Sequence, residues 1–518
     1  MAAIITDQIR ILNARNFLSG VTTAGSSYYS FIGLPNATDI QSDWDNAPPA
    51  PIDNFDYQNE VWETVIGLKK ITASDARLVV PKITWRSGNT YDLYRHDYTT
   101  SNSAKVSGAT NLYGSFFYVM NSDYRVYICL QNGTSPENPN GAPSLDEPTF
   151  VDLEPRAAGA SGDGYIWKYL FTISPSDIVK FDSTNYIPVP SDWFTSTENA
   201  AVRDNAVNGS IKTVIINNRG SGAGAASTAY YNVPIKGNGT GAECTITMNA
   251  DSQINSVVIS NQGSGYTWGN VDLAAGGVPT GTTLPVLDVI IGPKGGHGAD
   301  IFRELGTKNV LLYSRFENDI QNPDFITGNQ VARVGIVEAP NTYGTSSPFQ
   351  GDKASAVTAL RLTGTGYSSA TYTADSFVSQ TVSTGTTAIG RVVNYDPSTG
   401  VLKIWQDRTQ SGFTTVGVAS TSPQYGFDQV DFTSSPGTDG SLTIIGGSVS
   451  GGLSIDSTFT GVSTVINNRT FYLGQSFTNG IANPEVAKFS GNIIYVDNRP
   501  NVTRSTNQKE DIKVILQF

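Results

Sequence analysis

The sequence has few of the side chains on which most enzymatic and metal chemistry depends. Its 518 residues include two histidines, His96 and His297, and two cysteines, Cys129 and Cys244. Neither histidine has a cysteine or a second histidine at the spacing of a metal site, and no HExxH or CxxC pattern occurs. The two cysteines are far apart and are expected to be separate, buried, reduced thiols. We therefore expect no metal ion and no cofactor.

Charged residues are also scarce, at 15% of the chain against roughly 25% in an average soluble protein. The formal net charge of −12 argues against sequence-independent binding of nucleic acid, which needs a basic surface. The sequence contains no run of about eighteen apolar residues, so we expect no membrane span. Residues Met1 to Asp7 lack the basic and apolar regions of a signal peptide, so we expect synthesis in a cytoplasm.

Motifs for nucleotide or ester chemistry are missing as well. There is no Gly-x-Ser-x-Gly elbow, and the glycine-rich stretches at Gly220 and Gly237 lack the Lys-Ser/Thr ending of a phosphate loop. His297 lies among glycines that would allow contact with a ligand, although a turn histidine bonded to backbone groups is the favoured interpretation. Four acids are candidates for a glycosidase pair only because such pairs can come from anywhere in a sequence. They are Asp163, Asp182, Glu304 and Glu338. We expect these four residues to be turn formers and solvated surface acids instead of a catalytic pair.

Glycine, serine, threonine and aromatic residues are abundant, which predicts a mainly β protein with several domains. Short helices are expected only near the N-terminus. One begins at Thr6 or Asp7 and ends before Ser19-Gly20, with Ile5, Ile9 and Leu12 on one face. A second spans Asn59 to Lys69. Between them, the prolines of Trp44 to Pro51 predict an extended strap.

Changes in composition divide the chain into an antiparallel β core interrupted by two inserted β domains. The core segments are 1–204, 291–343 and 479–518, and the inserts are 205–290 and 344–478. The first insert repeats a strand-and-glycine unit, Val214–Gly222 and Val257–Gly265. In the second, Asp396 to Gly400 predicts a hairpin connection between Ala388–Tyr395 and Val401–Trp405. The tail carries strands at Ile493–Val496 and Ile512–Phe518, with Asp497 to Pro500 in the connector between them.

The most distinctive stretch runs from Gly162 to Ile173. Gly162 and Gly164 suit positive φ and Asp163 suits a turn, so a tight turn leads directly into a strand. The strand alternates between an aromatic face, formed by Tyr165, Trp167, Tyr169 and Phe171, and a second face formed by Ile166, Lys168 and Leu170. An aromatic face of this size needs a large partner surface, either the core of a domain or another subunit.

Gly162–Phe171 and Ile494–Pro500, together with Gln508–Phe518, resemble the gene-product-eight family of baseplate wedge proteins from T-even-type contractile-tailed phages, with cyanophage members the most similar. The residues that carry the resemblance are Gly162, Asp163, Gly164, Tyr165, Trp167, Asn498, Arg499 and Pro500. Further similar segments are Trp44–Pro51, Trp62 with Lys69–Ile71, Val79–Pro81 followed by Trp85, and Asp324–Ile336. The resemblance covers the three core segments and neither insert.

The resemblance implies a structural subunit of the virion tail baseplate. Such a protein forms a homodimer, contacts other baseplate wedge proteins, and takes part in assembly and in rearrangement on contraction. No enzymatic activity is known for the family. The alternative is that the inserts bind host-surface glycans, with Tyr266, Trp268, Tyr367 and Trp405 stacking on sugars, against the simpler expectation that these aromatics pack in the insert cores. A glycoside hydrolase is the least favoured interpretation.

Overall fold

The computed structural model describes residues 4–279, 281–318, 325, 327–383, 386–406, 441–505 and 507–518. Residues 407–440 of the second predicted insert and Asp324 of the resemblance therefore lie outside the described residues. The chain divides into two compact units. The first unit comprises Met1–Leu18, Arg77–Leu311 and Ile515–Phe518, and the second comprises Ser19–Ala76 and Leu312–Val514. Strands dominate both units and the helices are few and short, which confirms the predicted fold class.

The elements of the first unit are as follows, α1 and β3 each crossing a unit boundary. The helices are α1 (Asp7–Thr22), η2 (Leu112–Gly114), α3 (Pro175–Phe181), α4 (Ala200–Asp204) and α5 (Ile301–Glu304). The strands are β3 (Ala76–Pro81), β4 (Tyr118–Met120), β5 (Arg125–Asn132), β6 (Tyr165–Thr172), β7 (Tyr186–Pro188), β8 (Ile211–Asn218), β9 (Ala229–Gly237), β10 (Thr240–Met248), β11 (Ile254–Ser264), β12 (Gly269–Val271) and β13 (Val286–Ile291). Among the described residues, no helix has the length and apolar character needed to span a membrane.

Strand β6 contains the predicted aromatic face and pairs antiparallel with β5 in the sheet β4-β5-β6. Tyr165, Trp167 and Phe171 are fully buried and Tyr169 is half-buried, so the aromatic face lies against protein. The opposite face is covered too, because Lys168 is 2% exposed. The strand is therefore buried on both sides although it lies at the edge of its sheet.

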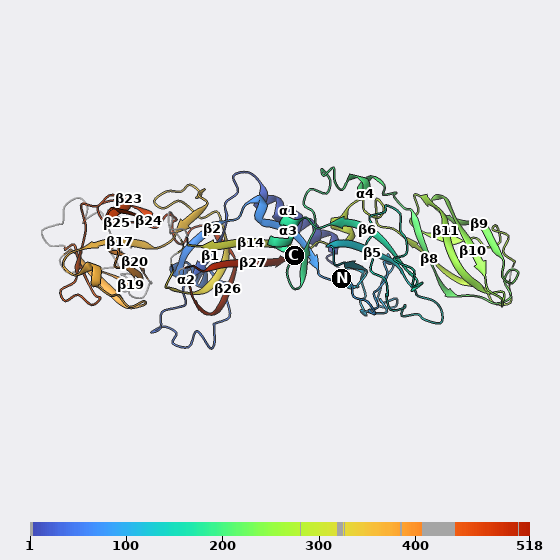
Figure 1. Ribbon diagram of the computed structural model, residues 1–518, viewed down its shortest axis with the longest axis horizontal. Helices are drawn as coiled ribbons and strands as arrows, with labels where there is room; N and C mark the ends of the chain where they lie inside the picture. The colour runs from blue at the N-terminus through green and yellow to red at the C-terminus, as the bar shows by residue number, and fades with distance from the viewer. Residues whose placement is uncertain are drawn as a thin grey trace. The chain divides into compact units, whose positions relative to one another are not determined.

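Strands β8 to β13 form two packed sheets, which Figure 1 draws in green. One sheet has the order β11-β10-β9-β12 and the other pairs β8 with β13. Buried aliphatic side chains from both sheets make one hydrophobic cluster, including Val214, Val233, Ile246 and Val289. The two copies of the repeated motif lie on β8 and β11 and belong to different sheets. One copy thus contributes a strand to the first sheet and the other copy contributes a strand to the second sheet, and both strands pack on the same hydrophobic cluster.

The elements of the second unit are as follows, β14 and β27 also crossing a unit boundary. The helices are α2 (Phe55–Thr64), η1 (Ala73–Asp75) and η3 (Tyr367–Ser369). The strands are β1 (Tyr28–Gly33), β2 (Val65–Lys70), β14 (Asn309–Glu317), β15 (Gln330–Glu338), β16 (Lys353–Ser355), β17 (Thr358–Thr363), β18 (Phe377–Ser383), β19 (Thr386–Asp396), β20 (Val401–Trp405), β21 (Thr443–Ile445), β22 (Leu453–Ile455), β23 (Gly461–Ile466), β24 (Arg469–Phe477), β25 (Ile481–Ala482), β26 (Asn492–Thr503) and β27 (Lys509–Gln517).

Two sheets organise the second unit. The first has the order β16-β2-β1-β15-β26, and helix α2 contributes Val61 and Trp62 to the core on this sheet. The second has the order β20-β19-β18-β21-β22-β17-β25, and β20 also pairs with β17. The hairpin predicted around Asp396 to Gly400 is confirmed, since β19 and β20 pair antiparallel and Gly400 has φ of +70°.

The prediction of one helix from Asn59 to Lys69 is wrong in its second half. Helix α2 begins after Asn54, whose side chain accepts a hydrogen bond from the Tyr57 amide at 2.7 Å, and it ends at Thr64. Val65 then starts β2, which pairs with β1. Because β-branched residues fit a pleated sheet better than a helix, the long-range pairing overrides the helical spacing of the apolar residues.

The predicted face of the N-terminal helix is also wrong. Ile5 and Leu12 are 70% and 49% exposed, whereas Ile11 and Ala14 are buried. Helix α1 also continues past Ser19-Gly20 to Thr22. Apolar residues occur on more than one side of this helix, so the tertiary contacts and not the spacing decide which side is buried.

The predicted connector at Asp497 to Pro500 is instead part of strand β26. In the register with β15, Arg333 faces Asn498 and Val331 faces Val502, with an irregularity between them. Strand β26 lies at the edge of its sheet. Pro500 is tolerated there because a proline at an edge strand or an irregularity leaves no required amide bond unmade.

Lys488 is a half-buried lysine in the second unit. Its Nζ donates a hydrogen bond to the carbonyl oxygen of Glu63 at 2.8 Å. Burial lowers the pKa of Lys488 from 10.5 to about 8, and the charge of Glu63 offsets part of that effect. Between these two pKa values the unfolded chain holds a proton that the folded chain does not. The charged form of Lys488 therefore destabilises the folded chain, and this destabilisation is fully present below about pH 8. It decreases as the pH rises through the window, so the stability of the folded chain increases with pH there.

We compare the free energy of unfolding of the Lys488→Met variant with that of the natural chain. The variant's advantage over the natural chain is expected to be about 2–3 kcal/mol larger at pH 7 than at pH 10.5. Urea unfolding of the natural chain and the variant at both pH values measures this difference. Comparison at each pH cancels the titration of the tyrosines. The same replacement at Lys509, whose side chain is 65% exposed, is the control and should show no such dependence. An equal difference at both pH values for Lys488→Met would contradict the prediction.

Candidate functional site

The signature turn before β6 is built by backbone conformation and close packing. Gly162 and Gly164 have φ of +70° and +83°. A Cβ on Gly164 would lie 2.7 Å from the Gly133 Cα, so no side chain fits there. The carboxylate of Asp163 accepts hydrogen bonds from the amides of Tyr165 at 3.0 Å and Leu145 at 2.8 Å. These three residues therefore hold a tight turn against neighbouring loops.

The aromatic residues of the signature form a stack inside the first unit. The rings of Tyr165 and Trp167 are stacked with centroids 5.2 Å apart, and Tyr91 meets Trp167 edge-on at 6.0 Å. The Tyr165 hydroxyl donates to the Ala142 carbonyl oxygen at 2.8 Å and accepts from the Tyr91 amide at 3.0 Å. The aromatic face of β6 is therefore part of a domain core and is not a free binding surface.

Asn498 and Arg499 join the extended strap to the sheet of the second unit. The Asn498 amide nitrogen donates to the Pro49 carbonyl oxygen at 2.7 Å. The carbonyl oxygen of Arg499 accepts a hydrogen bond from Trp44 Nε1 at 2.8 Å. The Arg499 side chain is exposed and pairs with Asp497 at 2.6 Å. Strand β26 thus fixes both ends of the proline-rich strap through backbone oxygens.

Arg333 lies beneath the same strap and is completely buried. Its Nη1 donates to Thr64 Oγ1 at 2.7 Å and its Nη2 to Glu60 Oε1 at 2.8 Å. Its Nε bonds to Asn498 Oδ1 at 3.3 Å, and its guanidinium carbon lies 4.9 Å from the Trp44 ring centroid. The signature residues of each unit thus belong to a cluster of packing and hydrogen-bond contacts within that unit.

Each candidate acid has a structural partner. Asp182 pairs with Lys82 at 2.8 Å, and Glu338 accepts from the Tyr28 hydroxyl at 2.5 Å. Asp163 holds the turn described above. Glu304 is the exception to the expected surface location, because it is 1% exposed.

The sequence predicted that His297 is a turn histidine bonded to backbone groups, and this prediction is wrong. It is buried, its Nδ1 lies 2.5 Å from Glu304 Oε1, and its ring packs edge-on against Tyr94. The second oxygen of Glu304 accepts from the Gly298 amide at 2.7 Å. The pair therefore pins the glycine-rich segment to helix α5. The sequence feature that could have predicted this pair is the position of Glu304, seven residues after His297 on the short helix that follows.

Cys129 and Cys244 are buried and free of disulfides, as predicted. Of the four insert aromatics, Tyr266 and Trp405 are buried and Tyr367 is half-buried, which contradicts a sugar-stacking role for the first two. Trp268 is 59% exposed. Among the residues that the structure describes, no cluster of three or more His, Cys, Asp or Glu side chains could hold a metal ion.

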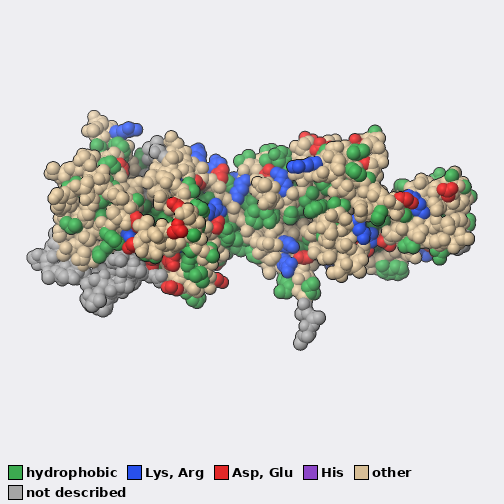
Figure 2. All heavy atoms as spheres, turned by 90° about the horizontal axis from the view of Figure 1, so that it is seen from below, with side chains coloured by type: hydrophobic (Ala, Val, Ile, Leu, Met, Phe, Trp, Pro, Cys, Tyr) green, Lys and Arg blue, Asp and Glu red, His purple; other side chains and the backbone are tan. Residues whose placement is uncertain are grey.

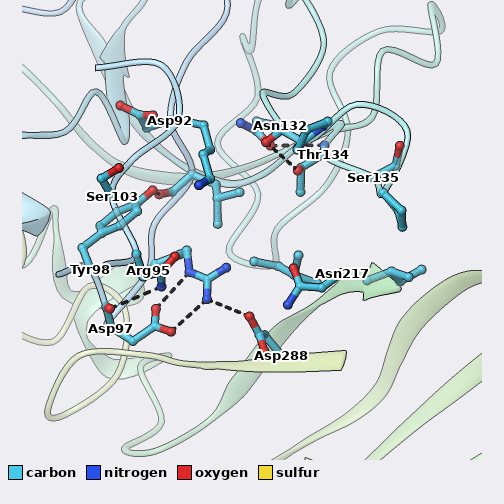
Figure 3. A pocket seen from close by; sticks show the side chains of 17 residues that line it. Asp92, Arg95, Asp97, Tyr98, Ser103, Asn132, Thr134, Ser135, Asn217 and Asp288 are labelled. Carbon is cyan, nitrogen blue, oxygen red and sulfur yellow. Dashed lines mark hydrogen bonds and ion pairs between the residues drawn. The ribbon is translucent and has the colours of Figure 1, made fainter. Parts of the chain in front are cut away.

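A polar pocket of about 400 Å³ opens in the first unit, beside strands β8 and β13 (Figure 3). Loops around residues 92–105 and 132–139 line one side, and Ile216, Asn217 and Asp288 line the other. The carboxylate of Asp92 accepts backbone hydrogen bonds from Val106 at 2.9 Å and Phe116 at 3.0 Å, which shapes the first loop. No local pattern indicated this pocket, since its residues are dispersed over nearly two hundred positions of the chain.

Arg95 is the central charge of the pocket and is only 8% exposed. Its Nε and Nη2 donate to the two oxygens of Asp97 at 2.9 and 2.8 Å, and Nη2 also reaches Asp288 Oδ2 at 2.8 Å. Burial by itself raises the pKa of Asp97, but the bonds and charge of Arg95 outweigh it and hold that pKa below its usual value. Both acids lower the cost of burying the guanidinium.

Surface charge is mixed on the face that Figure 2 displays. Acidic and basic side chains are interspersed among polar atoms, and no continuous basic area is visible there among the described residues. Known exposed pairs such as Arg315 with Asp511, 2.6 Å apart, follow the same pattern of neighbouring opposite charges.

The comparisons with known proteins point to a class of virion protein. No family model matches the chain. The chain is distantly related to baseplate wedge proteins. The relative found is the baseplate wedge protein gp8 of Enterobacteria phage T4, 24% identical over 202 residues. The match covers 36% of this chain and 60% of that protein, so it spans less than two thirds of the relative's length.

Proposed function

We propose that this protein is a structural subunit of a phage tail baseplate wedge, located in the virion, with no enzymatic activity of its own. The observation that carries the proposal is the sequence similarity to a baseplate wedge protein over 202 residues. The geometry is consistent with it. The glycines and aromatics of the signature turn and the Asn498–Arg499 pair are engaged in packing and hydrogen bonds within their own units.

The proposal extends to partners. We propose that two copies form a homodimer, that the dimer connects neighbouring wedge proteins, and that these contacts rearrange when the tail contracts. Each unit has a hydrophobic core of its own, so each unit can hold a stable surface for such contacts. Interfaces that must rearrange are expected to be modest in area and partly polar.

Co-expression with the other baseplate proteins encoded by the same phage genome tests this function. The tagged chain is expected to co-purify with at least one of them, and alone to scatter light as a particle of twice the mass of one chain. In virions, antibody labelling should mark the baseplate end of the tail. A monomer that captures none of these proteins and is missing from virions would overturn the proposal. Release of reducing ends from host polysaccharide would overturn the absence of enzymatic activity.

A further inference from the structure

The pocket around Arg95 has an unused hydrogen-bonding group at its centre. Arg95 bonds through Nε and Nη2, but its Nη1 has no partner among the described residues. Figure 3 shows this end of the guanidinium directed into the space between the loops and Asn217. A guanidinium nitrogen carries two N–H donors, and no described protein group accepts from those of Nη1. The pocket therefore offers a strong, oriented pair of donors to an oxygen atom.

The rim provides further polar groups that are not used by the fold. Ser103, Lys105 and Asn217 line the pocket and make no side-chain hydrogen bond to the described residues. The carboxylates of Asp97 and Asp288 each keep lone pairs beyond those that Arg95 occupies. Donors and acceptors thus alternate around one small volume, which matches a ligand whose own groups both donate and accept.

The charge balance selects a neutral ligand. Three carboxylates, those of Asp92, Asp97 and Asp288, line the pocket against the two cations Arg95 and Lys105. An anion would meet these acids, and a cation would meet the central guanidinium, so each is opposed by charge at short range. A hydroxyl group meets neither objection, because it accepts from Arg95 and donates to an aspartate.

The remaining lining suits the carbon face of a sugar ring. Leu93, Ile215, Ile216, Pro136 and the half-buried ring of Tyr98 supply apolar contact beside the polar groups. The volume of about 400 Å³ is within the range of small-molecule sites. We propose that this pocket binds one neutral saccharide unit, with Arg95 Nη1 donating to a sugar oxygen and Asp97 and Asp288 accepting from its hydroxyls.

Saturation-transfer NMR on the full chain with D-glucose, D-galactose, D-mannose and N-acetyl-D-glucosamine tests the proposal. At least one of these sugars is expected to bind, with a dissociation constant on the order of 1 mM for so small a ligand. The variant Asn217→Trp fills the mouth of the pocket from an exposed position and should weaken that binding at least tenfold. The control Trp268→Ala removes the exposed aromatic of the same insert, far along the sequence, and should leave binding unchanged.

The other outcomes each overturn the proposal. No signal from any of the four sugars would show that the pocket holds no saccharide. Binding that survives Asn217→Trp but is lost in Trp268→Ala would place the sugar on the exposed indole instead. Displacement of the sugar by an equal concentration of acetate or inorganic phosphate would identify an anion site. An unchanged melting profile for Asn217→Trp verifies that the variant is folded.

Discussion

Replacing Trp167 with alanine is expected to lower the free energy of unfolding of the first unit by about 3–5 kcal/mol. The side chain is 0% exposed, stacks on Tyr165 and packs edge-on against Tyr91, so its removal leaves a cavity between rings that cannot close. Its indole N–H has no hydrogen-bond partner among the described residues, so the whole loss comes from packing. Differential scanning calorimetry measures the shift.

Trp268→Ala is the matched control for this substitution. It removes the same side chain from the same unit, but from a position where 59% of the residue is exposed. A change within about 1 kcal/mol is expected there, as for other surface truncations. A Trp167→Ala variant with the same melting temperature as this control would contradict the core position of the aromatic stack and move it to a subunit interface.

Replacing Arg333 with alanine is expected to destabilise the second unit by about 3–5 kcal/mol, because it removes a completely buried guanidinium and leaves several of its hydrogen-bond partners unsatisfied. The change leaves the Thr64 hydroxyl and the Asn498 amide oxygen without their donor and takes the cation from beneath the Trp44 ring. The loss should loosen the proline-rich strap as well as lower stability. Hydrogen exchange of the Trp44 indole N–H, together with calorimetry, measures both effects.

Arg315→Ala is the comparison for Arg333. Arg315 also pairs with an acid, Asp511, but both side chains are close to half exposed, and such surface pairs contribute about 0–1 kcal/mol. A loss at Arg333 no greater than the loss at Arg315 would show that the buried network contributes nothing beyond a surface pair. Retained protection of the Trp44 N–H in Arg333→Ala would show that β26 holds the strap without it.

Local sequence patterns predicted the strands and turns well where one chemical requirement dominates. The turn at Gly162 to Gly164 needs positive φ, and only glycine adopts it without strain, so its position could be read directly. The hairpin at Asp396 to Gly400 follows the same logic. The alternation of aromatic residues in β6 correctly indicated a buried face, because a wide aromatic surface has few stable alternatives to a core.

Predictions failed where the decisive contact lies far away in the chain. Val65 to Lys70 keep a helical spacing of apolar residues, yet pairing with β1 makes them a strand. Asp497 to Pro500 read as a connector because of Asn and Pro, yet the register with β15 extends the strand through them. In both places backbone hydrogen bonds to a distant strand outweigh a local preference of a few tenths of a kcal/mol per residue.

The same division applies to the sites. Residue types alone indicated a mainly β chain, because glycine, serine, threonine and aromatic residues favour strands and tight turns. Only the tertiary structure decided that Glu304 is buried beside His297, that Arg333 lies under Trp44, and that Arg95 meets Asp288 across nearly two hundred residues. Burial and pairing depend on which distant segments come together, and that information is not contained in the spacing of neighbouring residues.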